Sequence, residues 1–131
     1  MKDIKPGCSG RADLVVGTSD LAVNVGSGSL EVFATPSMIA LMEKSACDCI
    51  QQYLENDETT VGTELCIKHI SATPTGMNVH AVAELAQING RELVFNVNAY
   101  DNAGLIGSGT HKRFLVFAEK FMSKTLGKLN G

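Results

Sequence analysis

The sequence has no tryptophan, and aromatic residues make up only 5% of its 131 residues. A core of this composition depends on aliphatic side chains and methionine. No apolar run approaches the ~20 residues of a membrane-spanning helix, and the first ten residues lack the apolar segment of a signal peptide. We therefore expect a protein of the cytoplasm with no membrane partner.

Charge and cysteine spacing exclude further classes of protein. The net charge is −3 and no basic stripe with interleaved aromatics is present, so no nucleic-acid partner is expected. No Cys-x-x-Cys pair and no glycine-rich phosphate loop occur, so we expect no metal site and no cofactor. We interpret the four cysteines as reduced thiols: Cys8, Cys47, Cys49 and Cys66.

What remains is the composition of a single globular domain, with 44% hydrophobic and 19% charged residues. The domain is expected to take in residues 1–131. Residues 1–10 contain proline, glycine and serine and are expected to form a loose lead-in. Residues 120–131 carry lysines four apart and are expected to form a solvated tail with helical spacing.

The stretch from Ala34 to Leu54 predicts one long helix. Thr35 is expected to be its N-cap and Pro36 its first residue, where a missing N–H costs nothing. Apolar residues then recur at helical spacing: Ile39, Met42, Ala46, Ile50 and Tyr53. Glu43 lies among them, and an ionised carboxylate that faces a core is unfavourable unless it is paired or functional. Glu43 is thus a candidate functional residue, unless its side chain simply reaches solvent at the edge of the stripe.

Around this helix the pattern has the period of two that is typical of strands. Short strands are expected at Arg11–Gly17 and Asp20–Val25, followed by a flexible connector at Gly26–Leu30. Four long strands are expected after the helix: Val61–Thr73, Met77–Ile88, Arg91–Asp101 and Leu105–Glu119. Tight turns make the sheet antiparallel, so we expect an α+β arrangement in which the sheet wraps the helix. Pairing through a sheet edge would give a homodimer.

This order of elements resembles the hotdog fold, and three stretches resemble the fluoroacetyl-CoA thioesterase-like family. These stretches are VFATPSMIALMEKSAC at Val32–Cys47, VGTELCIKHISATPTGM at Val61–Met77 and GSGTHKR at Gly107–Arg113. With the strands between them, the resemblance covers about two-thirds of the chain, from Glu31 to Lys120. It implies catalytic roles for Thr35, Glu43 and His69, and substrate-binding roles for Gly62 and Arg113.

The resemblance also implies an activity: hydrolysis of a small acyl-CoA to the free acid and CoA by a homodimer without a metal or redox cofactor. In that chemistry Glu43 is the general base or the nucleophile, and His69 carries the proton. Thr35 is the nucleophile or positions water. Two other interpretations stay open: a non-catalytic acyl-CoA-binding hotdog domain, and an acyl-thioester hydratase or dehydratase on the same fold.

Simpler roles are available for several of these residues. His69 lies on the same strand face as Leu65 and Ile67, and this face is expected to meet the helix. A histidine in such a place is commonly a hydrogen-bonded core residue. His80 and His111 are expected to be structural only, and Arg113 to form a salt bridge at the rim.

A regular helix also separates Thr35 from Glu43 by about 12 Å. Either Thr35 lies in a loop that folds back, or the substrate lies between the two residues, or the site combines two subunits.

The first prediction concerns Glu43. Thiol release from acetyl-, fluoroacetyl-, short-chain and aryl-CoA is expected for at least one ester, and Glu43→Ala is expected to reduce that turnover by about 10²-fold or more. A folded, dimeric protein without turnover across the panel would favour the acyl-CoA-binding domain.

Overall fold

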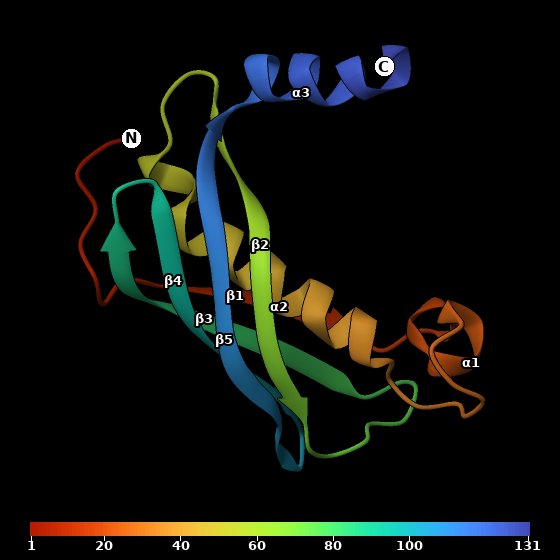
Figure 1. Ribbon diagram of the computed structural model, residues 1–131. Coiled ribbons are helices and arrows are strands. Elements are labelled where there is room, and N and C mark those ends of the chain that lie inside the picture. The colour runs from red at the N-terminus through yellow and green to blue at the C-terminus, as the bar shows by residue number, and fades with distance from the viewer.

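One long helix lies in the curve of one antiparallel sheet (Figure 1). A computed structural model describes residues 1–131. The long helix is α2 (Thr35–Ile50), and the strand order across the sheet is β1-β3-β4-β5-β2. The strands are β1 (Ser9–Val15), β2 (Glu58–His69), β3 (Asn78–Asn89), β4 (Glu92–Asp101) and β5 (Gly104–Phe117). The predicted α+β architecture is confirmed.

The predicted strand at Asp20–Val25 is wrong. A 3-10 turn (Thr18–Asp20) is followed there by the short helix α1 (Ala22–Val25), which ends at Gly26 in the left-handed conformation (φ 89°). A run of six residues is too short for its apolar spacing to separate a period of two from a period of 3.6. Leu21 still makes an isolated bridge to Phe33, and Val32 bridges to Pro74 in the connection between β2 and β3.

The ends of α2 also differ from the prediction. Ala34 occupies the N-cap position and Thr35 is the first helical residue, with no side-chain hydrogen bond capping the helix. The Thr35 hydroxyl is therefore not used as a cap. At the other end, α2 stops at Ile50 and a 3-10 turn (Gln51–Tyr53) continues almost to the predicted end at Leu54.

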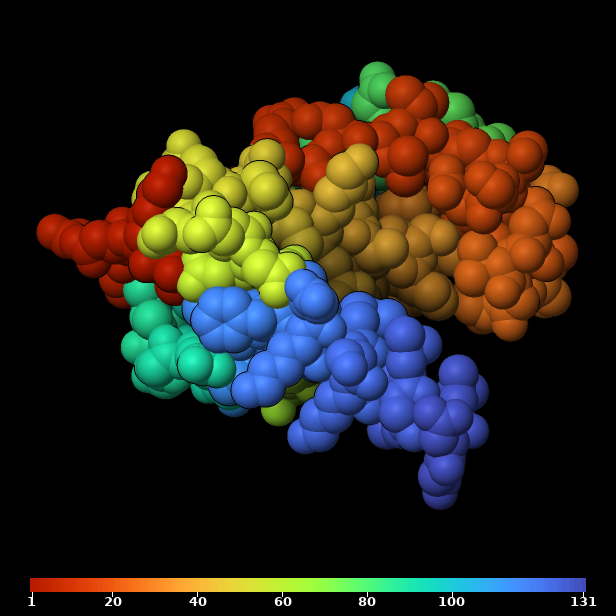
Figure 2. All heavy atoms as spheres, turned by 90° about the horizontal axis from the view of Figure 1, so that it is seen from above, coloured from red at the N-terminus to blue at the C-terminus, as the bar shows by residue number.

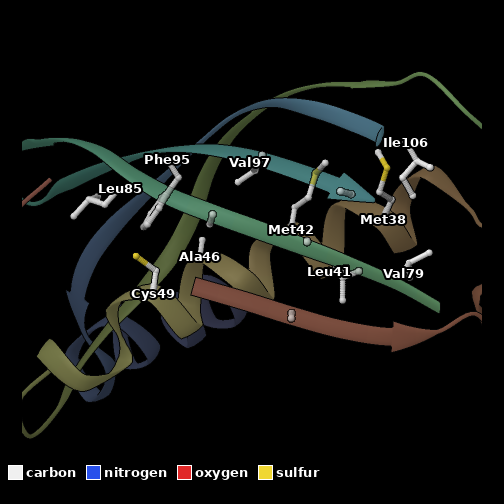
Figure 3. Packing of buried hydrophobic residues seen from close by; sticks show 14 of the residues in the cluster. Met38, Leu41, Met42, Ala46, Cys49, Val79, Leu85, Phe95, Val97 and Ile106 are labelled. Atoms are coloured by element: carbon white, nitrogen blue, oxygen red, sulfur yellow. The ribbon is translucent and has the colours of Figure 1, made fainter. Parts of the chain in front are cut away.

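The core lies between α2 and the concave face of the sheet (Figure 3). The helix contributes Met38, Leu41, Met42, Ala46 and Cys49, and the strands contribute Val79, Leu85, Phe95, Val97 and Ile106. Removing each of the larger aliphatic, methionine and phenylalanine side chains from water contributes about 1.5–3 kcal/mol. Fully buried small residues on the strands, Ala81, Ala83 and Ala99, let the helix approach closely.

Glycines extend this close approach at two points. A Cβ on Gly10 of β1 would collide with the backbone of Ser45 and Cys49 on α2. A Cβ on Gly107 of β5 would lie 2.6 Å from the Met38 side chain. β5 is therefore pressed against the helix at Gly107.

The N-terminal residues pack against the body of the protein, whereas the C-terminal residues do not. Residues 1–10 were expected to be loose, but Ile4 is buried and the Lys2 N–H donates to the Tyr53 carbonyl at 2.8 Å. The C-terminal residues form α3 (Ala118–Leu126) and a 3-10 turn (Gly127–Asn130), exposed and projecting from the body (Figures 1 and 2). None of the helices is both long and apolar enough to cross a membrane.

Replacing Gly10 tests the packing of α2. Gly10→Ala is expected to lower the free energy of unfolding by about 2–3 kcal/mol, because the added Cβ meets helix backbone that cannot move independently. Urea unfolding measures the difference. Gly127→Ala is the control, since its Cβ would meet nothing within 4 Å; equal stability of the two variants would contradict the proposed packing.

Candidate functional site

Thr35 and His69 form a hydrogen-bonded pair where the start of α2 meets the end of β2. Thr35 Oγ1 lies 2.8 Å from His69 Nδ1, although 34 residues separate them in the chain. The segment before α2 is held there because the Phe33 N–H donates to the Thr73 carbonyl at 2.8 Å. In the tautomer protonated at Nε2, His69 accepts the hydroxyl proton of Thr35, which is the arrangement that activates a hydroxyl nucleophile.

A cavity of about 430 Å³ opens beside this pair, and both residues line it. The connector Ser27–Leu30 forms part of the opposite wall, with small side chains at three of its four positions. Phe33, Ile70 and Ala72 add apolar surface. The first turn of α2 also points unpaired backbone N–H groups towards its N-terminus, where a developing negative charge is stabilised.

The environment of His69 keeps its ring neutral near pH 7. Burial lowers the pKa of His69, and the backbone of Ser71 opposes this to a smaller extent. Nε2 is buried and makes no hydrogen bond within the chain. A neutral imidazole with one unpaired nitrogen is suited to accept or deliver a proton.

Glu43 lies in a second cluster, near the middle of α2. Its Oε2 is 3.2 Å from Nη1 of Arg113 and 4.0 Å from Nε2 of His111, both on β5. Gly62 of β2 closes the cluster, because a Cβ at that position would lie 2.6 Å from Glu43 Oε2. The carboxylate is thus paired with a guanidinium rather than surrounded by apolar groups as its helical neighbours suggested.

Arg113 is not the rim residue that the sequence suggested. Its side chain is only 8% exposed. Nε donates to Thr60 Oγ1 at 2.9 Å and Nη2 donates to the Thr60 carbonyl at 3.0 Å. These bonds hold the guanidinium in the sheet and leave Nη1 directed at Glu43.

The prediction that His111 is structural only missed its contact with this cluster. The ring is fully buried, with Nε2 3.2 Å from Nη1 of Arg113 and Nδ1 2.9 Å from the Glu64 carbonyl. Burial lowers the pKa of His111, and the Arg113 charge adds to this, while the Glu64 carbonyl and Glu43 oppose it. Alternation along a strand puts His111 and Arg113 on one face of β5, but it does not identify their partner on α2.

One chain therefore contains two separate polar clusters, the Thr35–His69 pair and the Glu43–Arg113–His111 cluster. No hydrogen bond or ion pair joins Glu43 to either Thr35 or His69. Along β2, Gly62 and His69 are seven residues apart, which is roughly 20 Å at strand spacing. Along α2, Thr35 and Glu43 are about 12 Å apart. The loop that would fold Thr35 back is excluded, because Thr35 is part of the helix.

Comparison with known proteins identifies what this arrangement is similar to. A family model described as fluoroacetyl-CoA-specific thioesterase matches residues 16–119. The fluoroacetyl-CoA thioesterase of Streptantibioticus cattleyicolor is 44% identical over 98 residues, covering 75% of this chain and 70% of that protein.

Solved structures agree with the sequence comparison. A variant of the fluoroacetyl-CoA thioesterase FlK in complex with acetyl-CoA has a TM-score of 0.91 and 36% identity, covering 95% of this chain and 98% of that one. A thioesterase superfamily member from Thermus thermophilus has a TM-score of 0.89 and 26% identity, covering 99% and 96%. A hot-dog-like protein from Thermanaerovibrio acidaminovorans, at 19% identity and a TM-score of 0.86, shares the fold.

Half-buried His69 and fully buried His111 predict a pH dependence of stability. Their folded-state pKa lies below the ordinary 6.5, so the unfolded chain binds more protons as the pH falls through that value. The contribution of the two histidines to the free energy of unfolding is fully present above about pH 6.5 and decreases as the pH falls below it. Urea unfolding between about pH 7.5 and 5.5 measures the slope. His69→Gln and His111→Gln are each expected to flatten it, and an unchanged slope in both would contradict the effect of burial.

Proposed function

Since this chain belongs to the family of fluoroacetyl-CoA-specific thioesterases, we propose that it is an acyl-CoA thioesterase, which hydrolyses a small acyl-CoA to the free acid and CoA. The observation that carries the proposal is the hydrogen bond between Thr35 and His69 on the wall of the cavity. It pairs a hydroxyl with a neutral base beside a space for an acyl group. The small side chains of Ser27–Leu30 leave that space open, so a short acyl group other than fluoroacetyl also fits the proposal.

The proposed reaction begins at Thr35. Its hydroxyl attacks the thioester carbon while His69 takes the proton, and the negative charge on the carbonyl oxygen is stabilised by backbone N–H groups. The donors are those of the first turn of α2 or the amide of Gly62. The carbon–sulfur bond then breaks and His69 returns the proton to the CoA thiolate. The acyl group is then an ester of Thr35. Glu43 takes a proton from water, the hydroxide attacks the ester carbon, and the bond to Thr35 Oγ1 breaks, which releases the acid while Oγ1 regains the proton.

Arg113 has a supporting role in this scheme. Its Nη1 binds one oxygen of Glu43, so the carboxylate stays ionised and oriented. The groups required are side chains, backbone amides and water, and no metal or redox cofactor is part of the proposal. We place the reaction in the cytoplasm because coenzyme A thioesters are intracellular metabolites.

The separation of the Thr35–His69 pair from the Glu43–Arg113–His111 cluster supports a homodimer. β2 is an edge strand, and Leu65 at its centre is 39% exposed. An unpaired edge of this kind is a template for another strand. Antiparallel pairing of two β2 strands about an axis between Leu65 and Cys66 would place His69 opposite Gly62 of the partner subunit, because both positions are equally far from the axis. Thr35 and His69 of one protomer would then face Glu43 of the partner subunit.

A mixed dimer tests the function and the shared site together. Glu43→Ala and His69→Ala are co-expressed with different affinity tags, and the mixed dimer is isolated by two successive purifications. In a shared site, one active site of the mixed dimer carries both substitutions and the other carries neither. Thiol release at about half the wild-type rate per dimer is therefore expected.

Each variant alone serves as the control and is expected to be nearly inactive. A mixed dimer no more active than the two variants would place Glu43 and His69 of one chain in the same site. Failure to recover any mixed dimer, with both variants folded, would contradict the homodimer. Absence of thiol release by the wild-type protein would contradict the function itself.

A further inference from the structure

His111 is a fully buried titratable side chain that the proposed reaction does not use. Its ring lies between β2 and β4, stacked on Phe95 with ring centroids 6.2 Å apart. Two charged groups face it: Arg113 from its own strand and Glu43 from α2. β2 presents only the carbonyl of Glu64 to its other nitrogen. A polar ring in such a place is stable only if both nitrogens are satisfied.

The partners of the two nitrogens determine where the proton is. The Glu64 carbonyl 2.9 Å from Nδ1 can only accept a hydrogen bond, so Nδ1 carries the proton. The Arg113 guanidinium 3.2 Å from Nε2 can only donate, so Nε2 is unprotonated and accepts. His111 is therefore neutral and in a single tautomer, which makes it an acceptor for Arg113.

Arg113 Nη1 has two hydrogens and two acceptors. One is His111 Nε2 and the other is Glu43 Oε2, each at 3.2 Å. With the bonds from Nε and Nη2 to Thr60, each nitrogen of the guanidinium has an acceptor, and only Nη1 reaches a group outside the sheet, the carboxylate of Glu43. Glu43 uses only Oε2 in these contacts, so Oε1 makes no hydrogen bond within the chain and remains available to water.

We propose that His111 is a positioning residue, whose neutral ring fixes Nη1 of Arg113 where it orients the Glu43 carboxylate for hydrolysis. This inference rests on the proposed function, in which Glu43 activates water. A proton on Nε2 would remove the acceptor and place a second cation against the guanidinium. Arg113 would then turn away from His111, and Glu43 would lose its fixed orientation.

Two substitutions of similar size test the two roles of the His111 side chain separately: accepting a hydrogen bond and filling space. His111→Gln keeps an amide oxygen that can accept from Arg113, whereas His111→Leu fills the space without an acceptor. His111→Leu is expected to lower kcat by about 10-fold or more with KM within about 3-fold, and His111→Gln is expected to recover most of this loss. The wild-type rate is expected to decline on the acid side of a pH profile, with the decline shifted in His111→Gln because glutamine does not titrate. Equal rates for the two variants, whether both high or both low, would overturn the inference.

A measurement on the wild-type protein tests the inference without catalysis or refolding of a variant. Nitrogen-15 NMR of the histidine rings distinguishes a protonated nitrogen from an unprotonated one. At pH 7, His111 is expected to be protonated at Nδ1 and unprotonated at Nε2. Protonation at Nε2 would overturn the inference even if the enzyme is active. A lack of thioesterase activity together with the expected tautomer would instead contradict the proposed function.

Discussion

The close contact between α2 and the backbone of the strands is the constraint on which the structure depends. Gly10, Gly107 and the buried alanines of β3 and β4 remove the side chains that would hold the helix away from the sheet. With the helix this near, a short hydroxyl at its start reaches the end of β2, and a carboxylate at its middle reaches β5. The close approach of α2 to the strands therefore determines both the packing of the core and the positions of the polar groups.

Electrostatics then decides which polar groups can remain in such a core. A buried guanidinium is tolerated because each nitrogen of Arg113 donates to an acceptor. Its partner Glu43 is 37% exposed, so the carboxylate is paired on one side and open to solvent on the other. His69 differs, because one of its nitrogens is buried without a partner. The Arg113 cluster is thus satisfied within the chain, whereas the Thr35–His69 pair leaves one polar atom unpaired beside a cavity.

Much of the architecture was predictable because strands and turns leave local signals. Alternation identified the four long strands, and tight turns gave their antiparallel order; at the turn between β3 and β4, Gly90 has φ +64°. The family resemblance implied a joint role for Thr35 and His69, and their side chains lie 2.8 Å apart. The role of Thr35 at the helix start was misassigned, because a threonine before Pro36 fits an N-cap equally well. The ion pair of Glu43 and Arg113 joins residues 70 positions apart, and no local pattern records which arginine meets which carboxylate.

Gly62 has a consequence for how this protein can change over evolution. The position is exposed at a sheet edge and has no left-handed backbone, so its own conformation accepts any residue. Its missing side chain nevertheless leaves the volume that the Glu43 carboxylate occupies. A side chain can be acquired at position 62 only if position 43 changes or its carboxylate moves away from Arg113. The two sites are therefore expected to vary together among descendants of this sequence, although one lies on a strand and the other on a helix.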